Sequence, residues 1–303
     1  MKGEVRAIAP LYVDLIYSGF DALPEPGEEV YARSLDIQLG GGAAAIPVTL
    51  TRMGLPARLG TFLGEDRISR LAAGLLEEYG LKQYENLYRG VGRPVVASTV
   101  FSYGGDRSFL SFGDEITQSD LTDEACYAFL QGAAIAFAPQ GRPEVARRLH
   151  EGGTTLLYDI GWTSGMKLSD YTDILQCVDF FTPNEKEARQ LTGEERLEDA
   201  LRKLGEAVKI PVIKCGAEGC LTLYEGEILR VPAVSLFTAV DVTGAGDNFM
   251  AGLLYGVYRG WPLMRCLQMG NIFGGYSTTQ PGCYKAGLTL TQAMQFLQYY
   301  ETD

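Results

Sequence analysis

The sequence of 303 residues is poor in histidine and in basic residues, and both shortages exclude classes of function. His150 is the only histidine, and we expect it at the exposed end of a helix, so catalytic triads that use histidine as a base are excluded. Lys and Arg number 26 against 38 Asp and Glu, which gives a formal net charge of −12 at pH 7. This charge argues against nucleic acid or an anionic membrane as a partner. It does not argue against a nucleotide, which requires only a local positive potential and usually brings its own Mg²⁺.

Paired cysteines and long apolar runs are also missing. None of the six cysteines forms a Cys-x-x-Cys pair, so a zinc site is not expected, and cysteines scattered in apolar runs indicate small core residues in a reducing cytosol. No apolar stretch approaches the roughly 20 residues needed to cross a bilayer. The N-terminus has no signal-peptide pattern. We therefore expect a cytoplasmic protein that does not span a membrane.

The composition that is present is ordinary for a folded protein, with 46% hydrophobic and 21% charged residues. The length suffices for one large α/β domain or two small ones. Short apolar runs alternate with helical patterns, and the clearest strands are expected at 5–10, 57–63, 133–139, 154–158 and 208–214. This alternation predicts a mostly parallel sheet with helices on both faces. Because neither a repeat nor a low-complexity linker is visible, we interpret residues 1–303 as one domain.

Two segments interrupt the alternation of strands and helices. In the first, at about 12–39, residues 29–38 alternate loosely like an amphipathic strand. The second, at about 94–112, has the pattern of a hairpin that turns at Gly104–Gly105. A hairpin alone is marginally stable, so we predict that the two segments pair into a small sheet, called the lid below. Exposed strand edges of the lid are candidates for contact with a second copy of the chain.

The most informative stretch is Asp241–Asp247, with the sequence DVTGAGD. Gly244, Ala245 and Gly246 precede a helical apolar pattern. Small residues at the start of a helix let backbone N–H groups reach an anion, and the helix N-terminus adds about half a positive charge. Asp247 then lies in the first helical turn, where a carboxylate beside a phosphate is suited to accept a proton from an attacking hydroxyl. The alternative is a tight strand-to-helix turn with a capping aspartate. The glycine spacing matches neither a Walker loop nor a dinucleotide fingerprint.

This stretch resembles the C-terminal signature of the PfkB/ribokinase family of carbohydrate and nucleoside kinases. The resemblance implies a ribokinase-like three-layer αβα fold with a mostly parallel central sheet and a small β-sheet lid over the substrate. It also implies ATP-dependent phosphorylation of a hydroxyl group on a small sugar or sugar-like metabolite. Gly244, Ala245 and Gly246 would form the anion hole for the transferred phosphoryl group, and Asp247 would be the base.

For the substrate, the resemblance implies contacts from the N-terminal part of the chain. Asp14, which we place at the end of the first strand, corresponds to an aspartate that accepts hydrogen bonds from sugar hydroxyls; an aspartate that caps a loop is the alternative. Gly41, Gly42 and Ala45 lie in the glycine-rich stretch that contacts the sugar. Ile46 departs from the family, which usually has an asparagine there. One polar contact is therefore missing, and we expect a less hydroxylated or partly apolar substrate.

For the nucleotide, the resemblance implies three further groups. Asn184 and Glu187 match an Asn-x-x-Glu motif that is described as organising Mg²⁺ and phosphate through water; an ordinary capped helix is the alternative. Lys214 ends a strand, from which it is expected to reach the β- or γ-phosphate, with a solvated surface lysine as the alternative. Gly216 and Gly219 match a Gly-x-x-Gly turn under the nucleotide.

Two weaker correspondences complete the expected nucleotide and cation sites. Asn271 lies where members of the family often have an asparagine beside the nucleotide base. Asp241, Thr243, Ser277 and Gly282 match positions that bind a monovalent cation such as K⁺ in some relatives.

Alternatives to a sugar kinase remain. A sugar or sugar acid is the first expected substrate, and a nucleoside is the second because of Ile46 and the aromatic residues of the lid. A non-catalytic metabolite sensor on the same fold is the rival from another class, although a sensor needs neither the base Asp247 nor the pair Asn184 and Glu187. A hydroxymethylpyrimidine- or pyridoxal-type kinase ranks lower because those relatives typically lack the lid. By analogy we also expect a homodimer that forms through the lid.

Overall fold

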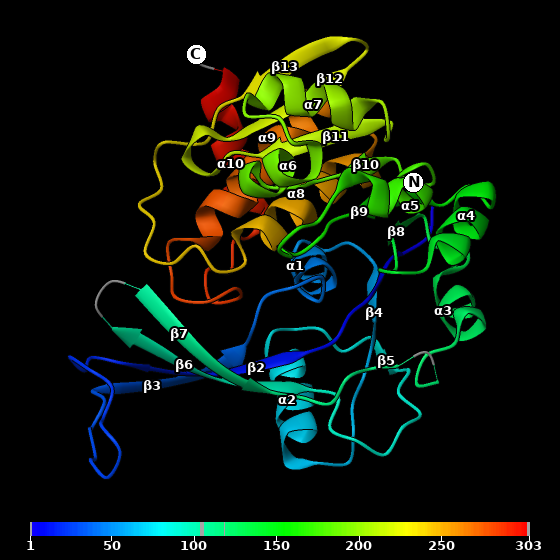
Figure 1. Ribbon diagram of the computed structural model, residues 1–303. Helices are drawn as coiled ribbons and strands as arrows, with labels where there is room; N and C mark the ends of the chain where they lie inside the picture. Colours follow the sequence, from blue (N-terminus) through cyan, green and yellow to red (C-terminus); the bar gives the residue numbers. More distant parts are fainter. Residues whose placement is uncertain (1, 104–105, 118, 302–303) are drawn as a thin grey trace.

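The computed structural model describes residues 2–103, 106–117 and 119–301, and a nine-stranded sheet runs through its centre (Figure 1). In spatial order the strands are β13 (Glu227–Val231), β12 (Cys220–Tyr224), β11 (Ile210–Lys214), β10 (Phe180–Phe181), β9 (Thr155–Tyr158), β8 (Ile135–Phe137), β1 (Val5–Ile8), β4 (Ala57–Thr61) and β5 (Tyr84–Asn86). All neighbours from β11 to β5 are parallel, and β12 and β13 add an antiparallel hairpin at one edge. The predicted mostly parallel sheet is therefore confirmed.

Helices cover both faces of this sheet, which makes three layers. Consecutive strand residues such as Leu156 and Leu157 are buried in different apolar clusters, as alternation along a strand requires. One face carries α1 (Ala45–Arg52), α8 (Ala245–Arg259), α9 (Leu263–Ser277) and α10 (Leu290–Leu297). The other carries α3 (Asp123–Leu130), α4 (Pro143–Glu151), α5 (Thr172–Leu175), α6 (Glu185–Thr192) and α7 (Leu197–Gly205). Three short 3₁₀ helices are described at Leu168–Tyr171, Gly216–Glu218 and Gln298–Glu301.

The lid is a separate four-stranded sheet, at the lower left of Figure 1. Its strands lie in the order β3 (Ser34–Leu39), β2 (Tyr12–Ser18), β6 (Val96–Tyr103) and β7 (Asp106–Phe112). Helix α2 (Arg67–Glu78) packs under β2 and β3 through an apolar cluster that includes Val13, Leu39 and Leu76. The two predicted segments thus combine in one small sheet. The strand expected over 29–38 begins only at Ser34, and the turn expected at Gly104–Gly105 lies outside the described residues.

The first apolar run is not one strand, as the sequence suggested, but two strands in different sheets. β1 belongs to the central sheet and β2 to the lid, and Pro10, which has no N–H to donate, lies between them. Asp14 is therefore the third residue of a lid strand and does not end a strand of the central sheet. The prediction of its position in the fold was wrong.

Several expectations about single residues agree with the structure. The six cysteines are free thiols and are all buried. His150 is exposed in the last turn of α4. In the described part of the chain, no helix combines the length and the apolar character that a membrane span needs.

Candidate active site

The N-terminus of α8 has the backbone shape that the glycines predict. Gly244 adopts a left-handed conformation with φ 75° and ψ 5°, directly before the helix. A Cβ atom on Gly244 would lie 2.2 Å from Sγ of Cys283, so both the backbone angle and the packing require glycine there. The first amides of a helix have no acceptor within the helix. The amides of Gly246 and Asp247 therefore belong to a helix end that is suited to bind an anion.

Asp247 lies in the first turn of α8, against the glycine-rich loop that leads into α1. Its Oδ2 accepts a hydrogen bond of 2.7 Å from the backbone N–H of Gly42. A Cβ atom on Gly41 would be only 2.9 Å from the same oxygen, so the loop approaches this closely because it lacks side chains. Desolvation raises the pKa of Asp247, while the bond from Gly42 and the charge of Lys214 oppose the rise. A carboxylate with increased proton affinity is suited to act as a base.

Three neighbouring strands bring a second group of polar residues together at their C-terminal ends. Asp159 follows β9, Thr182 follows β10, and Lys214 ends β11. Lys214 Nζ lies 3.1 Å and 3.0 Å from the two carboxylate oxygens of Asp159, and both side chains are 14% exposed. The alternative of a solvated surface lysine is therefore wrong. Asp159 was not predicted as a site residue, although an acid directly after a predicted parallel strand was the available signal.

Asn184 and Glu187 form a capping box at the start of α6. Oδ1 of Asn184 accepts a bond of 2.9 Å from the N–H of Glu187, and Oε2 of Glu187 accepts a bond of 2.8 Å from the N–H of Asn184. Glu187 is buried, at 4% exposure. An isolated bridge pairs Asn184 with Lys214, so the box lies beside the Lys214 end of β11.

Two loops meet at Asp241, where the sequence predicts a monovalent cation. Oδ1 of Asp241 accepts a bond of 3.0 Å from the N–H of Thr243, and Oδ2 accepts one of 2.5 Å from the N–H of Gly282. Ser277 ends α9 shortly before the second loop, and its hydroxyl donates to the carbonyl oxygen of Gly274 at 2.8 Å. Over the described ranges of the chain, no group of three or more His, Cys, Asp or Glu side chains is arranged to hold a metal ion.

Gly219 and Asn271, two residues expected near the nucleotide, both contact the backbone at the end of β13. Nδ2 of Asn271 donates to the carbonyl oxygens of Val231 and Pro232, at 2.9 Å and 3.0 Å. A Cβ atom on Gly219 would lie 2.0 Å from the Val231 carbonyl oxygen, so glycine is required where the turn meets this strand end. Gly216 opens the same turn with φ 54°.

The residues expected to bind the substrate lie between the lid and α1. Asp14 is partly buried, and its Oδ2 would be 2.8 Å from a Cβ atom on Gly40. Ala45 and Ile46 begin α1 and are fully buried, Ile46 in the apolar cluster of the central sheet. Ile46 therefore packs into the core in this conformation. It provides no surface for a partly apolar substrate, and the expectation drawn from it loses its basis.

Two lid residues near this region were not predicted. Tyr12 precedes Asp14 by two positions, so the two side chains share a face of the lid. Burial and the charge of Asp247 raise the pKa of Tyr12. Gln38 lies opposite Asp14 in the strand pairing and is 1% exposed. Its Oε1 has no hydrogen-bond partner among the described residues, and its carboxamide lies directly over Gly282.

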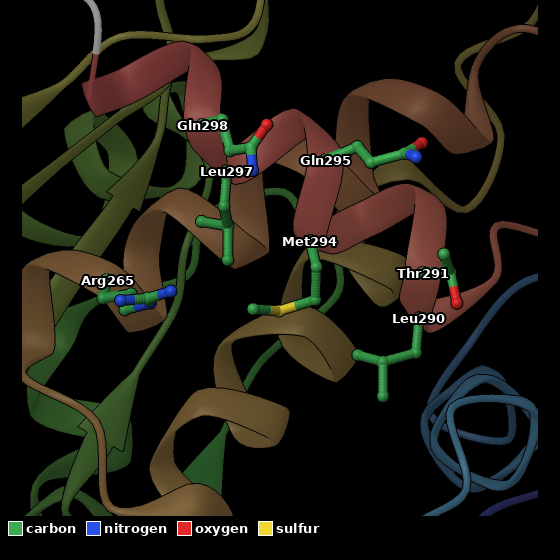
Figure 2. Close-up of a pocket in the computed structure, with 7 residues that line it drawn as sticks. All are labelled: Arg265, Leu290, Thr291, Met294, Gln295, Leu297 and Gln298. Carbon is green, nitrogen blue, oxygen red and sulfur yellow. The ribbon is translucent and has the colours of Figure 1, made fainter.

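A cavity of 590 Å³ lies elsewhere, between α9 and α10 (Figure 2). It is lined by Arg265 of α9 and by α10 residues that include Leu290, Met294 and Leu297. Arg265 lies near the start of α9, which a short turn connects to the far end of α8 from Asp247. Asp247 and Arg259 are 12 positions apart in α8, so roughly 18 Å of helix separates Asp247 from that end. The cavity is therefore not part of the site around Asp247.

Comparisons with known proteins give a consistent result. The profile of the pfkB family carbohydrate kinases matches residues 9–289. The chain is 25% identical over 289 residues to a ribokinase of Arabidopsis thaliana, a match that covers 88% of this chain and 76% of the relative. It is 41% identical over 101 residues to a cytidine kinase of Thermococcus kodakarensis, which covers 32% of this chain and 36% of that kinase. The solved structure of an Arabidopsis thaliana ribokinase complexed with ribose and ATP superimposes with a TM-score of 0.83 at 21% identity, over 98% of this chain and 99% of that one.

Proposed function

This chain belongs to the pfkB family of carbohydrate kinases, and from that membership we propose that it transfers the γ-phosphoryl group of ATP to a hydroxyl of a small sugar or sugar-like metabolite. The observation that carries the proposal is Asp247 beside the glycine-flanked N-terminus of α8, held by the N–H of Gly42 at 2.7 Å. The ATP in the similar plant ribokinase structure supports ATP as the donor.

In the proposed reaction, Asp247 accepts the proton of the acceptor hydroxyl. The hydroxyl oxygen forms a bond to the γ-phosphorus as the bond from that phosphorus to the bridging oxygen breaks, and ADP leaves. The anion hole of Gly244, Ala245 and Gly246, with the α8 dipole, stabilises the charge that develops on the transferred group. The lid excludes water from the reacting groups and so suppresses hydrolysis of ATP.

The residues at the start of α6 fit a role toward Mg²⁺ through water. The capping box fixes the side chains of Asn184 and Glu187, whose oxygen atoms are the ligand type that Mg²⁺ prefers. Within the described residues no acidic cluster would enclose the ion directly. This fits an ion that keeps several waters and binds substrate phosphates. When bound, Mg²⁺ would neutralise charge on the phosphates.

We assign the remaining predicted residues to nucleotide and cation in the same way. Lys214 is placed toward the phosphates, and Gly216, Gly219 and Asn271 toward the nucleotide. Asp241, Thr243, Ser277 and Gly282 form the proposed K⁺ site, supported by the bonds of Asp241 that join the two loops.

For the acceptor, we propose a sugar or sugar acid that contacts Asp14, Gly41, Gly42 and Ala45. The second candidate is a nucleoside, favoured by the local similarity to a cytidine kinase. Ile46 is not an argument for a nucleoside, because its side chain is buried in the core. A metabolite sensor without activity is the remaining rival.

We further propose that two copies pair through the outer face of the lid. Strand register places Leu35, Ile37, Leu110 and Phe112 on one face, and each is at least 40% exposed. Exposed apolar surface of this kind is typical of an interface. Light scattering tests the pairing: we expect the mass of a dimer, and a monomer at micromolar concentration would contradict it.

An acceptor panel tests the proposed function. Sugars, sugar acids and nucleosides are each incubated with ATP and Mg²⁺, and ADP release and the phosphorylated product are measured. Thermal shift with a non-hydrolysable ATP analogue is the parallel binding measurement, since a ligand at 100 times its Kd adds about 2.7 kcal/mol to the free energy of unfolding. Acceptor-dependent ADP release is the expected result. If no acceptor class causes ADP release and the ATP analogue does not raise the melting temperature, the kinase proposal is contradicted.

A further inference from the structure

The ion pair of Lys214 and Asp159 lies at the mouth of the anion hole. The side chain of Lys214 runs along the N-terminus of α8, because its Cδ, Cε and Nζ all lie within 3.7 Å of the point where a Cβ atom on Gly246 would be. Nζ itself is 3.1 Å from that point. The absence of a side chain at Gly246 therefore makes room for the ammonium group.

Asp159 is fixed in turn by its own neighbours. Its Oδ1 accepts a bond of 3.1 Å from the hydroxyl of Thr182, which follows the strand between β9 and β11. Both carboxylate oxygens contact the ammonium group of Lys214. An ammonium group has three N–H donors. The two contacts with Asp159 use at most two of them, which leaves one donor for a ligand.

The ammonium group also balances the negative charges of this edge of the sheet. Burial raises the pKa of Asp159 to about 6, Lys214 opposes that rise, and the charges of Glu187 and Asp247 add to it. Lys214 likewise opposes the rise in the pKa of Asp247. The positive charge of Lys214 thus stabilises the ionised forms of Asp159 and Asp247, at the place where ATP would bring further negative charge.

A role in stability alone explains this arrangement poorly. Burying an ion pair costs desolvation of both groups, and replacing such a pair by apolar residues is often neutral or stabilising. Ordering a flexible lysine in advance is instead useful for binding, because the entropy of the side chain is then lost before the ligand arrives.

We propose that Asp159 is a positioning residue that holds Lys214 beside the anion hole, ready to contact the γ-phosphate of ATP. This inference rests on the proposed kinase function. It adds a role for Asp159 and a mechanism for Lys214: the carboxylate directs the lysine, and the lysine contacts the nucleotide.

The test compares Asp159→Asn, Lys214→Met and the double variant by calorimetric titration with a non-hydrolysable ATP analogue, with ADP and with AMP, each with Mg²⁺. Asn keeps the size of the side chain and an oxygen for Thr182. We expect Asp159→Asn to weaken binding of the ATP analogue about tenfold, as for the loss of a charge-assisted contact, and to leave binding of AMP unchanged. Because Asp159 acts through Lys214, the double variant should bind the analogue no more weakly than Lys214→Met alone.

The chain offers a control ion pair at the N-terminal ends of the same strands. Lys209 and Asp179 form an ion pair of 2.9 Å just before β11 and β10. Asp179→Asn removes the same kind of ion pair, although the side chain of Lys209 is 69% exposed, and we expect it to leave the affinity for all three nucleotides unchanged. Circular dichroism melting curves check that each variant is folded.

Three results would overturn the inference. They are an affinity of Asp159→Asn for the analogue equal to that of the wild type, an equal loss for all three nucleotides, and a loss that persists in the Lys214→Met background. If the wild type phosphorylates an acceptor and any of these is found, only this inference fails. If the wild type binds the analogue but phosphorylates nothing, the proposed function fails, and the titrations still decide the role of Asp159.

Discussion

Replacing Asp247 by Asn removes the proposed proton acceptor and leaves almost everything else in place. The amide oxygen of Asn can still accept the bond that Gly42 N–H now gives to Oδ2 at 2.7 Å. The side chain keeps its volume in the first turn of α8, and the amides of the anion hole are unaffected. The variant therefore isolates proton acceptance from nucleotide binding.

The expected size of the effect follows from the role of a general base. Such a group contributes about 10²- to 10⁴-fold to the rate, which corresponds to roughly 2.7–5.4 kcal/mol of activation free energy at 1.36 kcal/mol per tenfold. The effect on stability should have the opposite sign. A carboxylate whose pKa is raised in the folded state contributes stability at low pH that is lost as the pH rises through the folded pKa. At pH 7 the neutral amide is therefore expected to leave the melting temperature unchanged or higher.

The assay measures kcat with the best acceptor from the panel at saturating ATP, together with the Kd of a non-hydrolysable ATP analogue. We expect kcat to fall by at least a hundredfold, with the Kd within about threefold of the wild type. Asp199→Asn, on the exposed face of α7, is the control for the substitution itself and should not change kcat. Turnover by the Asp247→Asn variant within tenfold of the wild type would refute the assignment of the base.

Three further predictions concern other parts of the chain. Ile46→Asn introduces the residue that is usual in the family. Because Ile46 is fully buried, this change should lower the free energy of unfolding, measured by urea titration, by about 3 kcal/mol or more. A stability equal to that of the wild type would contradict the core position of Ile46. Gly74→Ala should raise that free energy by up to about 1 kcal/mol at constant kcat, since Gly74 lies inside α2 with open space at its Cβ position; destabilisation would contradict this. Because the pKa of Asp247 in the free protein is raised above 3.8, kcat/KM for the acceptor should fall with decreasing pH before that value is reached, and a profile of kcat/KM with its acid limb at 3.8 or below would contradict the raised pKa.

The features that the sequence predicts well are those encoded within a few residues. Gly244 and Gly246 flank the start of α8 as expected because a left-handed turn and a close approach both depend on the local backbone. Asn184 and Glu187 likewise lie three positions apart at a helix start, and the capping box follows from that spacing. Whether the same pair also organises Mg²⁺ stays a prediction.

The features that the sequence did not predict depend on the order of the strands. Asp159 and Lys214 are 55 positions apart and meet only because β9, β10 and β11 are neighbours. Gln38 meets Gly282 because the lid folds against the loop after α9. Ile46 occupies the position where the family usually has asparagine, but a position in the sequence does not reveal whether the side chain points to the ligand or to the core.

The structure separates the proposed chemistry from the proposed recognition of the acceptor. Asp247 lies on α8, Lys214 ends β11, and the capping box begins α6, so these groups belong to the three-layer part of the fold. The lid instead presents a polar row in which Asp14 pairs with Gln38 on one side and with Ser98 on the other. Ser98 is 5% exposed, and its hydroxyl bonds with that of Ser111 on β7 at 2.9 Å.

This separation gives a physical reason why relatives of this chain are named for different acceptors, such as ribose and cytidine. A change in the polar row would alter the hydrogen bonds offered to the proposed acceptor without moving the proposed base or anion hole, because the lid is a separate sheet. The buried Oε1 of Gln38 has no partner among the described residues and leaves one acceptor in this row for a donor from outside. Substitutions in the row should therefore change the KM for the acceptor more than the affinity for ATP, whereas substitutions at Lys214 should do the reverse.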